Sequence, residues 1–220
     1  MNCLLCGQQM VESFKISEIM LLQKETPTVC NDCLSQFTKI PDCHCPLCFK
    51  EGSSEICDDC HYWEKKGVKP SHQSLYLYND AMKNFFSQYK FEGDYLLRKV
   101  FSRDIKNFFK NYKNYTIVPI PTTEKRFSQR QFNQVIGLLD AAKIAYQDIL
   151  IKNESIAQSK KTKIERLSTT DLFKLKSKVK TAKNILLVDD IYTTGATIAS
   201  VQKLLYQNGV RKVISFSLAR

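Results

Sequence analysis

The stretch ILLVDDIYTTGAT, residues 185–197, joins an apolar strand to two adjacent carboxylates and a threonine-rich turn. Four apolar residues lead directly into Asp189 and Asp190, and Gly195 lies within the turn that follows. Adjacent carboxylates at the end of a buried strand are costly unless something binds them. The carboxyl ends of parallel strands are also the edge at which open α/β sheets bind ligands. The stretch therefore predicts a buried strand, a ligand-binding turn and a helix.

The turn after the carboxylates has the chemistry that a phosphate needs. Gly195 lets the backbone approach an anion, threonine hydroxyls donate hydrogen bonds, and the following helix N-terminus adds partial positive charge. Because the carboxylates can accept hydrogen bonds from sugar hydroxyls, the whole stretch predicts a site for a phosphorylated pentose. The alternative is an ordinary strand-to-helix turn with a capping aspartate, which explains one carboxylate and not two. Neither GxxxxGK[ST] nor a helix-opening GxGxxG occurs.

Apolar patterning beyond this stretch predicts strands that alternate with helices. Such alternation indicates an α/β fold with a parallel sheet flanked by helices. Residues 153–182 interrupt it with a lysine-rich segment, which we expect to be a functional loop. The expected strands are 74–78, 115–120, 148–151, 184–190 and 211–219, and the expected helices are 79–90 (capped by Asn79), 94–112, 133–147 and 196–207.

The first sixty residues contain all nine cysteines, and eight of these form four Cys-x-x-Cys pairs. A two-residue gap lets both thiolates face one tetrahedral ion, and two pairs complete a closed Cys₄ site. The pairs therefore predict two structural zinc ions, which a segment with few apolar runs needs in order to fold. Sequential pairing and cross-bracing both stay open, and disulfides are the alternative to metal. The predicted ligands are Cys3, Cys6, Cys30, Cys33, Cys45, Cys48, Cys57 and Cys60, with Cys43, His44 and His61 expected to be bystanders.

Charge is distributed unevenly along the chain, whose net charge is +11. Residues 1–60 hold four basic and nine acidic side chains, whereas residues 61–220 hold 29 and 13. A basic surface attracts phosphates, from pyrophosphate to nucleic acid. The acidic cysteine-rich segment is therefore not expected to be the main DNA-binding surface. We expect a zinc-binding module over 1–62, a linker over 63–73 and a second domain over 74–220.

The sequence favours a cytoplasmic protein. No apolar run approaches the ~18 residues that a membrane span requires. The first ten residues lack the basic region and apolar stretch of a secretory signal. Paired cysteines in a reducing compartment are metal ligands more often than disulfides.

The stretch 185–197 resembles the phosphoribosyl pyrophosphate (PRPP) motif of type I phosphoribosyltransferases. With its cysteine pairs, the chain resembles the ComF/ComFC family of bacterial competence proteins over nearly its whole length. It departs from that family at Gln131, Lys152 and Thr169, where the family usually has Gly, Arg and Asn. Further matches are VPIPTTEKRFSQRQFNQ (118–134, with Arg130, Phe132, Asn133 and Gln134), YKFEGD (89–94) and the pattern Lys152, Gln158, Arg166, Phe173.

The resemblance implies a role for each part of the site. Asp189 and Asp190 would be the catalytic residues and would accept hydrogen bonds from the ribose hydroxyls, while Mg²⁺ bridges pyrophosphate and ribose oxygens. The turn would hold the 5′-phosphate, the segment after Pro121 would face pyrophosphate, and the lysine-rich segment would form a lid or meet nucleic acid. The PRPP-binding residues would be Asp189, Asp190, Thr193, Thr194, Gly195, Ala196, Thr197, Thr122, Thr123, Lys125 and Arg126, and the flexible-loop or DNA residues Lys152, Gln158, Lys160, Lys161 and Arg166.

The family implies a competence protein that handles or imports single-stranded DNA in the cytoplasm during natural transformation. A helicase-type DNA translocase would be its partner. The alternative is an active Mg-dependent phosphoribosyltransferase with an unidentified acceptor. Rings interleaved with lysines over 85–91 and 108–115 could stack bases, although their helical spacing favours core packing. We expect single-strand affinity to come from the basic domain as a whole.

Overall fold

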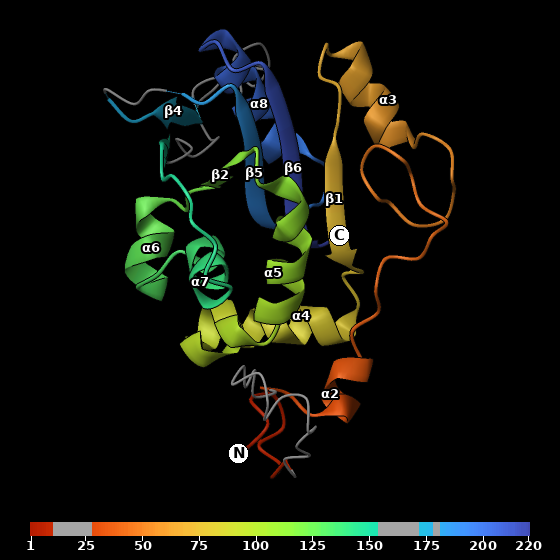
Figure 1. Ribbon diagram of the computed structural model, residues 1–220, viewed down its shortest axis with the longest axis vertical. Coiled ribbons are helices and arrows are strands. Elements are labelled where there is room, and N and C mark those ends of the chain that lie inside the picture. Colours follow the sequence, from red (N-terminus) through yellow and green to blue (C-terminus); the bar gives the residue numbers. More distant parts are fainter. Residues whose placement is uncertain (11–27, 154–171, 178–180) are drawn as a thin grey trace, which may run out of the picture.

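The structure is a computed structural model that describes residues 1–10, 28–153, 172–177 and 181–220 (Figure 1). Its centre is a four-stranded parallel sheet in the order β1-β6-β5-β2, with helices on both faces. The predicted α/β fold with a parallel sheet is therefore confirmed. The strands of this sheet are β1 (His72–Tyr76), β2 (Thr116–Pro119), β5 (Asn184–Ile191) and β6 (Lys212–Ala219).

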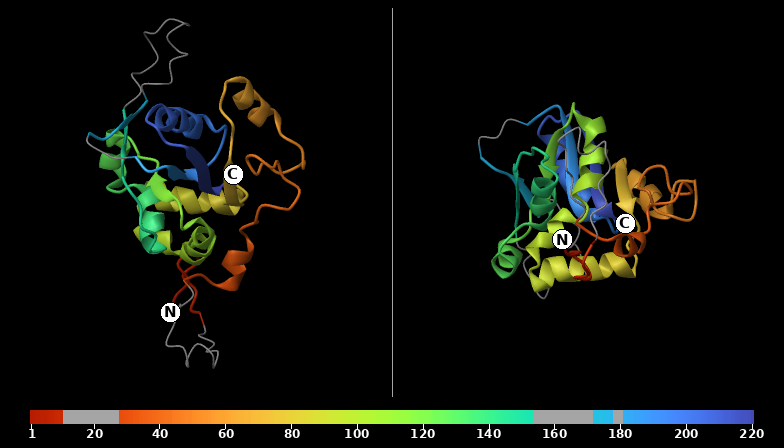
Figure 2. Two further views of the ribbon diagram at one scale, coloured as in Figure 1. Left: turned by 45° about the horizontal axis from the view of Figure 1, so that its top comes forward. Right: turned by 60° about the horizontal axis from the view of Figure 1, so that its bottom comes forward.

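Strand β5 is buried on both faces, as a central parallel strand requires. Leu186 and Val188 pack into one core layer, whereas Ile185 and Leu187 pack into the other. Helices of the middle of the chain cover the first layer, and α8 (Ala196–Gln207) covers the second (Figure 2). The covering elements of the first layer are α4 (Asp80–Ser87), a π-helical turn (Gln88–Glu92), a 3₁₀ turn (Tyr95–Lys99), α5 (Ser102–Phe109), a 3₁₀ turn (Lys110–Tyr112) and α7 (Gln134–Ala141).

Several local predictions hold. Asn79 caps α4 by accepting a hydrogen bond from the Met82 N–H at 3.0 Å. Helix α8 has the predicted bounds and ends at Asn208. The rings of Phe85, Phe86 and Phe109 are buried in the core, which confirms the packing interpretation of these aromatics.

Other local predictions were wrong. The strand near 148–151 is β3 (Leu150–Lys152), which pairs antiparallel with β4 (Phe173–Leu175) outside the main sheet. The helix expected over 133–147 ends at Ala141, because Lys143 adopts a left-handed φ of 58° and the Ile144 N–H returns to the Leu139 carbonyl. The helix expected over 94–112 is broken into α5 and two 3₁₀ turns.

Three short helices were not predicted. They are α2 (Asn31–Ser35), α3 (Asp58–Lys65) and α6 (Glu124–Arg130). Helix α3 contains residues 63–65, which were expected to begin the linker. It begins after Cys57 with Asp58 and Asp59 in its first turn, where acidic side chains favour a helix N-terminus. No helix in the described ranges has both the length and the apolar run needed to cross a bilayer.

Candidate functional site

The two carboxylates lie where expected, at the carboxyl end of β5. Asp190 is 7% exposed, and its Oδ2 lies 2.6 Å from Nζ of Lys90, which is itself largely buried. The second carboxylate oxygen accepts the Ile191 N–H at 2.7 Å. Lys90 comes from the π-helical turn, and its Nζ also lies 4.3 Å from the Phe86 ring. The buried carboxylate of Asp190 is thus paired with the ammonium group of Lys90, and this ion pair is part of the site.

Asp189 lies beside this ion pair and is partly buried. Its Oδ1 accepts the Asp190 N–H at 2.9 Å. Burial, and then the neighbouring charge of Asp190, raise the pKa of Asp189 to about 7, while Lys152 and Lys90 act in the opposite direction. The ionised form of Asp189 is therefore costly in the free protein and would gain from hydrogen-bond donors on a ligand.

A hollow of about 420 Å³ opens on the β2 side of the carboxylates. It is lined by Thr122, Asn133, Lys152 and neighbouring side chains. Among the described residues, the buried Thr122 Oγ1 has no hydrogen-bond partner. Burial lowers the pKa of Lys152, and the charge of Asp189 opposes that effect. The structure thus brings an unsatisfied hydroxyl and a partly desolvated amine to one hollow.

Helix α6 carries the other residues predicted to face pyrophosphate. Thr123 caps this helix by accepting the Arg126 N–H at 3.4 Å, and Lys125 and Arg126 are exposed on its first turns. Gln131 ends the helix with a left-handed φ of 65°, a conformation that glycine adopts with less strain. Asn133 caps α7 by accepting the N–H groups of the next turn.

The turn predicted to hold a phosphate, the 193–197 loop, joins β5 to α8. Thr193, Thr194 and Ala196 are exposed, and Thr197 is half-buried. Gly195 has a φ of 80°, and a Cβ there would overlap the hydroxyl of Tyr192 and lie 3.3 Å from Trp63 Nε1. Glycine is therefore required both by the backbone conformation and by the two rings beneath it.

Side chains distant in sequence support this loop. The Trp63 Nε1–H donates to the Thr194 carbonyl at 2.7 Å, and Arg220 Nη1 donates to the Thr193 carbonyl at 3.3 Å. The Tyr192 ring stacks on the buried His72 ring at 3.9 Å, and the Arg220 guanidinium lies 4.6 Å from the centre of the Tyr192 ring. The sequence predicts no role for these four side chains, because no local pattern distinguishes them. Lys90 was also given none, although it lies in the quoted motif YKFEGD.

A second hollow, of about 400 Å³, lies on the β6 side of the same edge. Thr193 and Tyr192 line it from the loop, whereas Lys50 and Asp59 line it from the cysteine-rich segment. Arg220 and Tyr78 complete its wall. The cysteine-rich segment and the C-terminal residue Arg220 therefore both contribute to the surroundings of the 193–197 loop.

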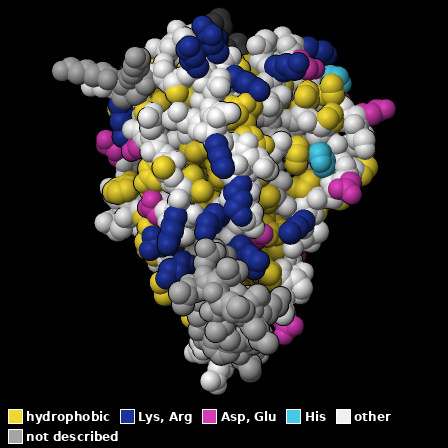
Figure 3. All heavy atoms as spheres, in the orientation of Figure 1, with side chains coloured by type: hydrophobic (Ala, Val, Ile, Leu, Met, Phe, Trp, Pro, Cys, Tyr) yellow, Lys and Arg dark blue, Asp and Glu magenta, His cyan; other side chains and the backbone are white. Residues whose placement is uncertain are grey.

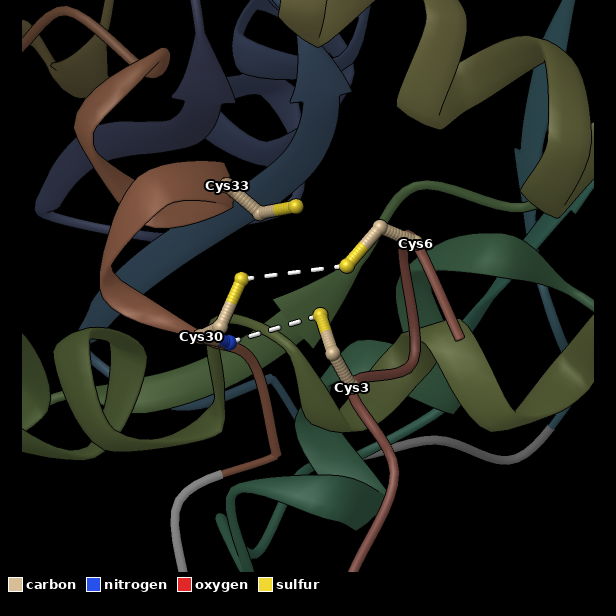
Figure 4. Close-up of side chains that lie close together, drawn as sticks. All are labelled: Cys3, Cys6, Cys30 and Cys33. Atoms are coloured by element: carbon tan, nitrogen blue, oxygen red, sulfur yellow. Dashed lines mark hydrogen bonds between the residues drawn. The ribbon is translucent and has the colours of Figure 1, made fainter. Parts of the chain in front are cut away.

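The four cysteine pairs combine sequentially into two clusters. The first cluster is Cys3, Cys6, Cys30 and Cys33, whose side chains point toward a common centre (Figure 4), and the second is Cys45, Cys48, Cys57 and Cys60. In each cluster all ligand atoms lie within 4.8 Å of one another. Tetrahedral zinc with Zn–S bonds of about 2.3 Å places sulfurs about 3.8 Å apart. The measured Sγ distances of 3.8 Å (Cys6–Cys30), 3.8 Å (Cys45–Cys60) and 3.4 Å (Cys48–Cys57) fit such an ion.

Backbone donors favour thiolates in both clusters. The Cys30 N–H donates to Cys3 Sγ at 3.3 Å, and the Cys57 N–H donates to Cys45 Sγ at 3.4 Å. Burial would raise the pKa of Cys3 and Cys45, but backbone N–H groups outweigh it and lower each pKa to about 6. Because metal binding needs thiolates, these contacts suit zinc ligands.

The three bystander predictions are confirmed among the described residues. Cys43 is exposed and belongs to neither cluster. The His44 ring stacks on Phe49 at 4.0 Å, and His61 faces Glu64 at 3.5 Å. The predicted flexible-loop residues Gln158, Lys160, Lys161 and Arg166, and the departure at Thr169, lie outside the described residues.

Basic side chains dominate the face of the molecule seen in Figure 1. Figure 3 shows lysines and arginines in a band down the middle of this face, over the region of α5, with acidic side chains toward the margin near α3. Acidic side chains also lie at the opposite margin of this face, so the excess of basic side chains is confined to the band. A band of this kind favours polyanions.

The parallel sheet with its flanking helices, the acidic edge of β5 and the two Cys₄ clusters define an α/β protein with a small N-terminal module whose cysteines could hold two metal ions. The chain is 49% identical to the competence protein ComFC of Streptococcus pneumoniae, over 100% of both chains. It is 35% identical to ComFC of Bacillus subtilis, over 99% of this chain and 94% of that protein. The chain therefore belongs to the ComFC family of competence proteins.

Comparisons with protein-family models and with solved structures do not add to this family assignment. No protein-family model matches the chain. A solved structure of a hypoxanthine phosphoribosyltransferase from Staphylococcus aureus aligns with 56% of this chain and 63% of its own. The identity is 15% and the TM-score is 0.33.

Proposed function

We propose that this protein handles incoming single-stranded DNA in the cytoplasm during natural transformation, and that its α/β domain binds PRPP with Mg²⁺. The observation that carries the proposal is the carboxylate pair at the end of β5. One member is held by the buried Lys90, and the other has a raised pKa beside a glycine-containing loop. Membership of the ComFC family supports the role in competence.

Each part of the proposed PRPP site has a distinct task. Asp189 and Asp190 accept hydrogen bonds from the ribose hydroxyls, and the 193–197 loop with the N-terminus of α8 holds the 5′-phosphate. Thr122, whose hydroxyl is buried without a partner among the described residues, donates to the pyrophosphate. The side that faces pyrophosphate in this proposal also includes Thr123, Lys125, Arg126 and Lys152. Mg²⁺, when bound, supplies charge neutralisation between phosphate oxygens and needs few protein ligands.

The zinc module has a structural task in this proposal. Closed Cys₄ sites with zinc leave no open coordination position, so they stabilise residues 1–62 and do no chemistry themselves. Each Zn(Cys)₄ centre carries a net charge of about −2 and adds to an acidic segment. We propose this segment as the docking surface for a helicase-type DNA translocase. Residues 66–71, between α3 and β1, then connect this segment to the main sheet.

Single-stranded DNA would bind the basic face. Lysines and arginines on the band over α5 neutralise backbone phosphates without reading sequence. Affinity should therefore fall steeply as salt rises, and it should depend little on base composition. An affinity that does not change with salt would exclude this surface.

A second candidate function is phosphoribosyl transfer to an acceptor. The hollow of about 400 Å³ on the β6 side favours it, because it lies opposite the proposed pyrophosphate side and reaches Thr193. In that reaction electrostatic stabilisation of an oxocarbenium-like state would come from the site itself, with no covalent nucleophile. Release of pyrophosphate from PRPP in the presence of an acceptor pool is the direct measurement.

A transformation assay tests the proposal. The variant Asp189→Ala/Asp190→Ala is compared with wild type for DNA uptake, with zinc content and single-strand affinity measured on both purified proteins. We expect loss of transformation with unchanged zinc content and DNA affinity. Wild-type transformation by this variant would show that the carboxylate edge has no part in the function.

A further inference from the structure

Trp63 connects the second cysteine cluster to the 193–197 loop. It is the one tryptophan of the chain and lies on α3, three residues after the cluster member Cys60. Cys57 is the N-cap of the same helix, so two of the four ligands hold α3 directly. The Nε1–H of Trp63 donates to the Thr194 carbonyl at 2.7 Å, a bond between residues 131 positions apart.

Arg220 makes a second connection between α3 and the loop. Its Nη2 lies 3.6 Å from Oδ2 of Asp59, which is on α3, and its Nη1 donates to the Thr193 carbonyl. The side chain is 6% exposed, and its guanidinium packs over the Tyr192 ring. Two consecutive carbonyls of the loop are thus held by side chains that belong to α3 or pair with it.

Holding these carbonyls sets the direction of the loop's donors. In a trans peptide the C=O of one residue and the N–H of the next point in opposite directions. The described backbone contains no cis peptide bond. The Thr193 and Thr194 carbonyls point toward Arg220 and Trp63, so the N–H groups of Thr194 and Gly195 point to the opposite side of the loop. That is the arrangement in which backbone N–H groups bind an anion.

Packing beneath the loop leaves little freedom for another arrangement. Tyr192 lies between the His72 ring and the Arg220 guanidinium, and Gly195 has no room for a Cβ above Tyr192 and Trp63. Cys45, Cys48 and Cys60 belong to the same buried cluster as Tyr192 and the α8 residue Ile198. The second cluster and the loop therefore share one core.

We propose that Trp63 is a positioning residue for the 193–197 loop, and that the second cysteine cluster, by holding α3, controls the affinity of this loop for the 5′-phosphate. The proposal rests on the proposed function, since it assumes that the loop binds a phosphate. Loss of metal from the second cluster releases α3, frees the two carbonyls and lowers ligand affinity. Metal supply to this cluster would then regulate the ligand site.

The test compares Trp63→Phe with Tyr62→Phe. The first keeps a ring but removes the N–H donor, and the second alters the exposed neighbouring ring on the same helix. Affinity for Mg·PRPP is measured by calorimetry, with zinc content measured on the same samples. We expect Trp63→Phe to bind about tenfold more weakly, near the upper limit for the loss of one hydrogen bond, with zinc retained. Tyr62→Phe should match wild type.

A ligand-free measurement separates this inference from the proposed function. Amide hydrogen exchange of the peptide covering 195–200, in which the Ala199 N–H donates to the Gly195 carbonyl at 2.8 Å, should be faster in Trp63→Phe than in wild type and Tyr62→Phe. Wild-type affinity and exchange in Trp63→Phe would overturn the inference while leaving the proposed function intact. If wild type does not bind Mg·PRPP, the proposed phosphate site fails. The exchange rates then decide the positioning role alone, and equal rates would overturn it.

Discussion

The two cysteine clusters have the same ligands and spacing but different surroundings. Cys3 of the first cluster packs with Val29 and Phe37 into the core layer covered by α4, α5 and α7. The second cluster packs into the opposite layer, together with Tyr192 and α8. The clusters therefore join different core layers, and the second one shares its core with the 193–197 loop. We therefore propose that the first cluster has a purely structural role, whereas the second also positions the 193–197 loop.

The largest expected effect concerns the ion pair between Lys90 and Asp190, which depends on neither cluster. Lys90→Met leaves Asp190 buried without its cation, and we expect a loss of about 3 kcal/mol in the free energy of unfolding. Urea unfolding near neutral pH measures it, with zinc content unchanged. The double variant Lys90→Met/Asp190→Asn should recover much of the loss. An equal loss in the free energy of unfolding for both variants would show that the ion pair between Lys90 and Asp190 does not stabilise the protein.

A matched pair of cysteine substitutions tests the comparison itself. Cys30 and Cys57 are both half-buried N-caps, of α2 and α3, and each belongs to one cluster. Each change to serine should lower zinc content by one ion per chain. Cys57→Ser should weaken Mg·PRPP binding by about tenfold through the loss of the Trp63 contact, whereas Cys30→Ser should leave the affinity near wild type. Equal effects on affinity would abolish the distinction between the clusters.

The pKa of Asp189 predicts how the stability of the protein changes with pH. Its folded-state pKa of about 7 lies above the ordinary value of 3.8, so its contribution to stability is complete at low pH and is lost as pH rises through 7. Asp189→Asn removes this dependence. The free energy of unfolding of Asp189→Asn, relative to that of wild type, should rise by about 1 kcal/mol between about pH 6 and pH 8.

The pH measurement uses urea unfolding of the zinc-loaded proteins at both values, with Asp148→Asn, an exposed carboxylate paired with Lys176, as the control. A stability difference that is constant over this range would contradict the raised pKa of Asp189.

The smallest expected effect lies on the β2 side, away from the second cluster. Gln131 has a φ of 65° at the end of α6. Gln131→Gly should relieve the strain and stabilise the protein by about 0.5 to 1 kcal/mol, seen as a higher melting temperature. The increment should add to the effect of Cys57→Ser, because distant sites without shared partners are additive. A destabilised Gln131→Gly would show that the side chain, which donates to the Ser128 carbonyl, outweighs the strain.

Features encoded locally could be predicted from the sequence. The run before Asp189 is buried on both faces, so it is apolar without interruption, and β5 follows from it directly. Helix α8 is amphipathic and is followed by Asn208-Gly209, which fixes its C-terminal end. The Cys-x-x-Cys spacing predicts the ligands, although only the fold decides that the pairs combine sequentially.

Features that depend on topology could not be predicted. Trp63 and Arg220 meet consecutive carbonyls of one loop because β1, β5 and β6 are neighbours in the sheet, and no local pattern encodes that arrangement. Helix α6 was missed because it is polar on nearly all sides and depends on the Thr123 cap. Lys90 lay within a recognised motif, but its role required the position of Asp190.

The central claim is that the carboxylate edge of β5 binds a phosphorylated ribose. Calorimetric titration of zinc-loaded wild type and Asp189→Ala/Asp190→Ala with Mg·PRPP tests it most directly. We predict saturable binding to wild type at a stoichiometry of one, and no detectable binding to the double variant with its zinc content unchanged. Absence of binding to wild type, or equal binding to both proteins, would contradict the claim.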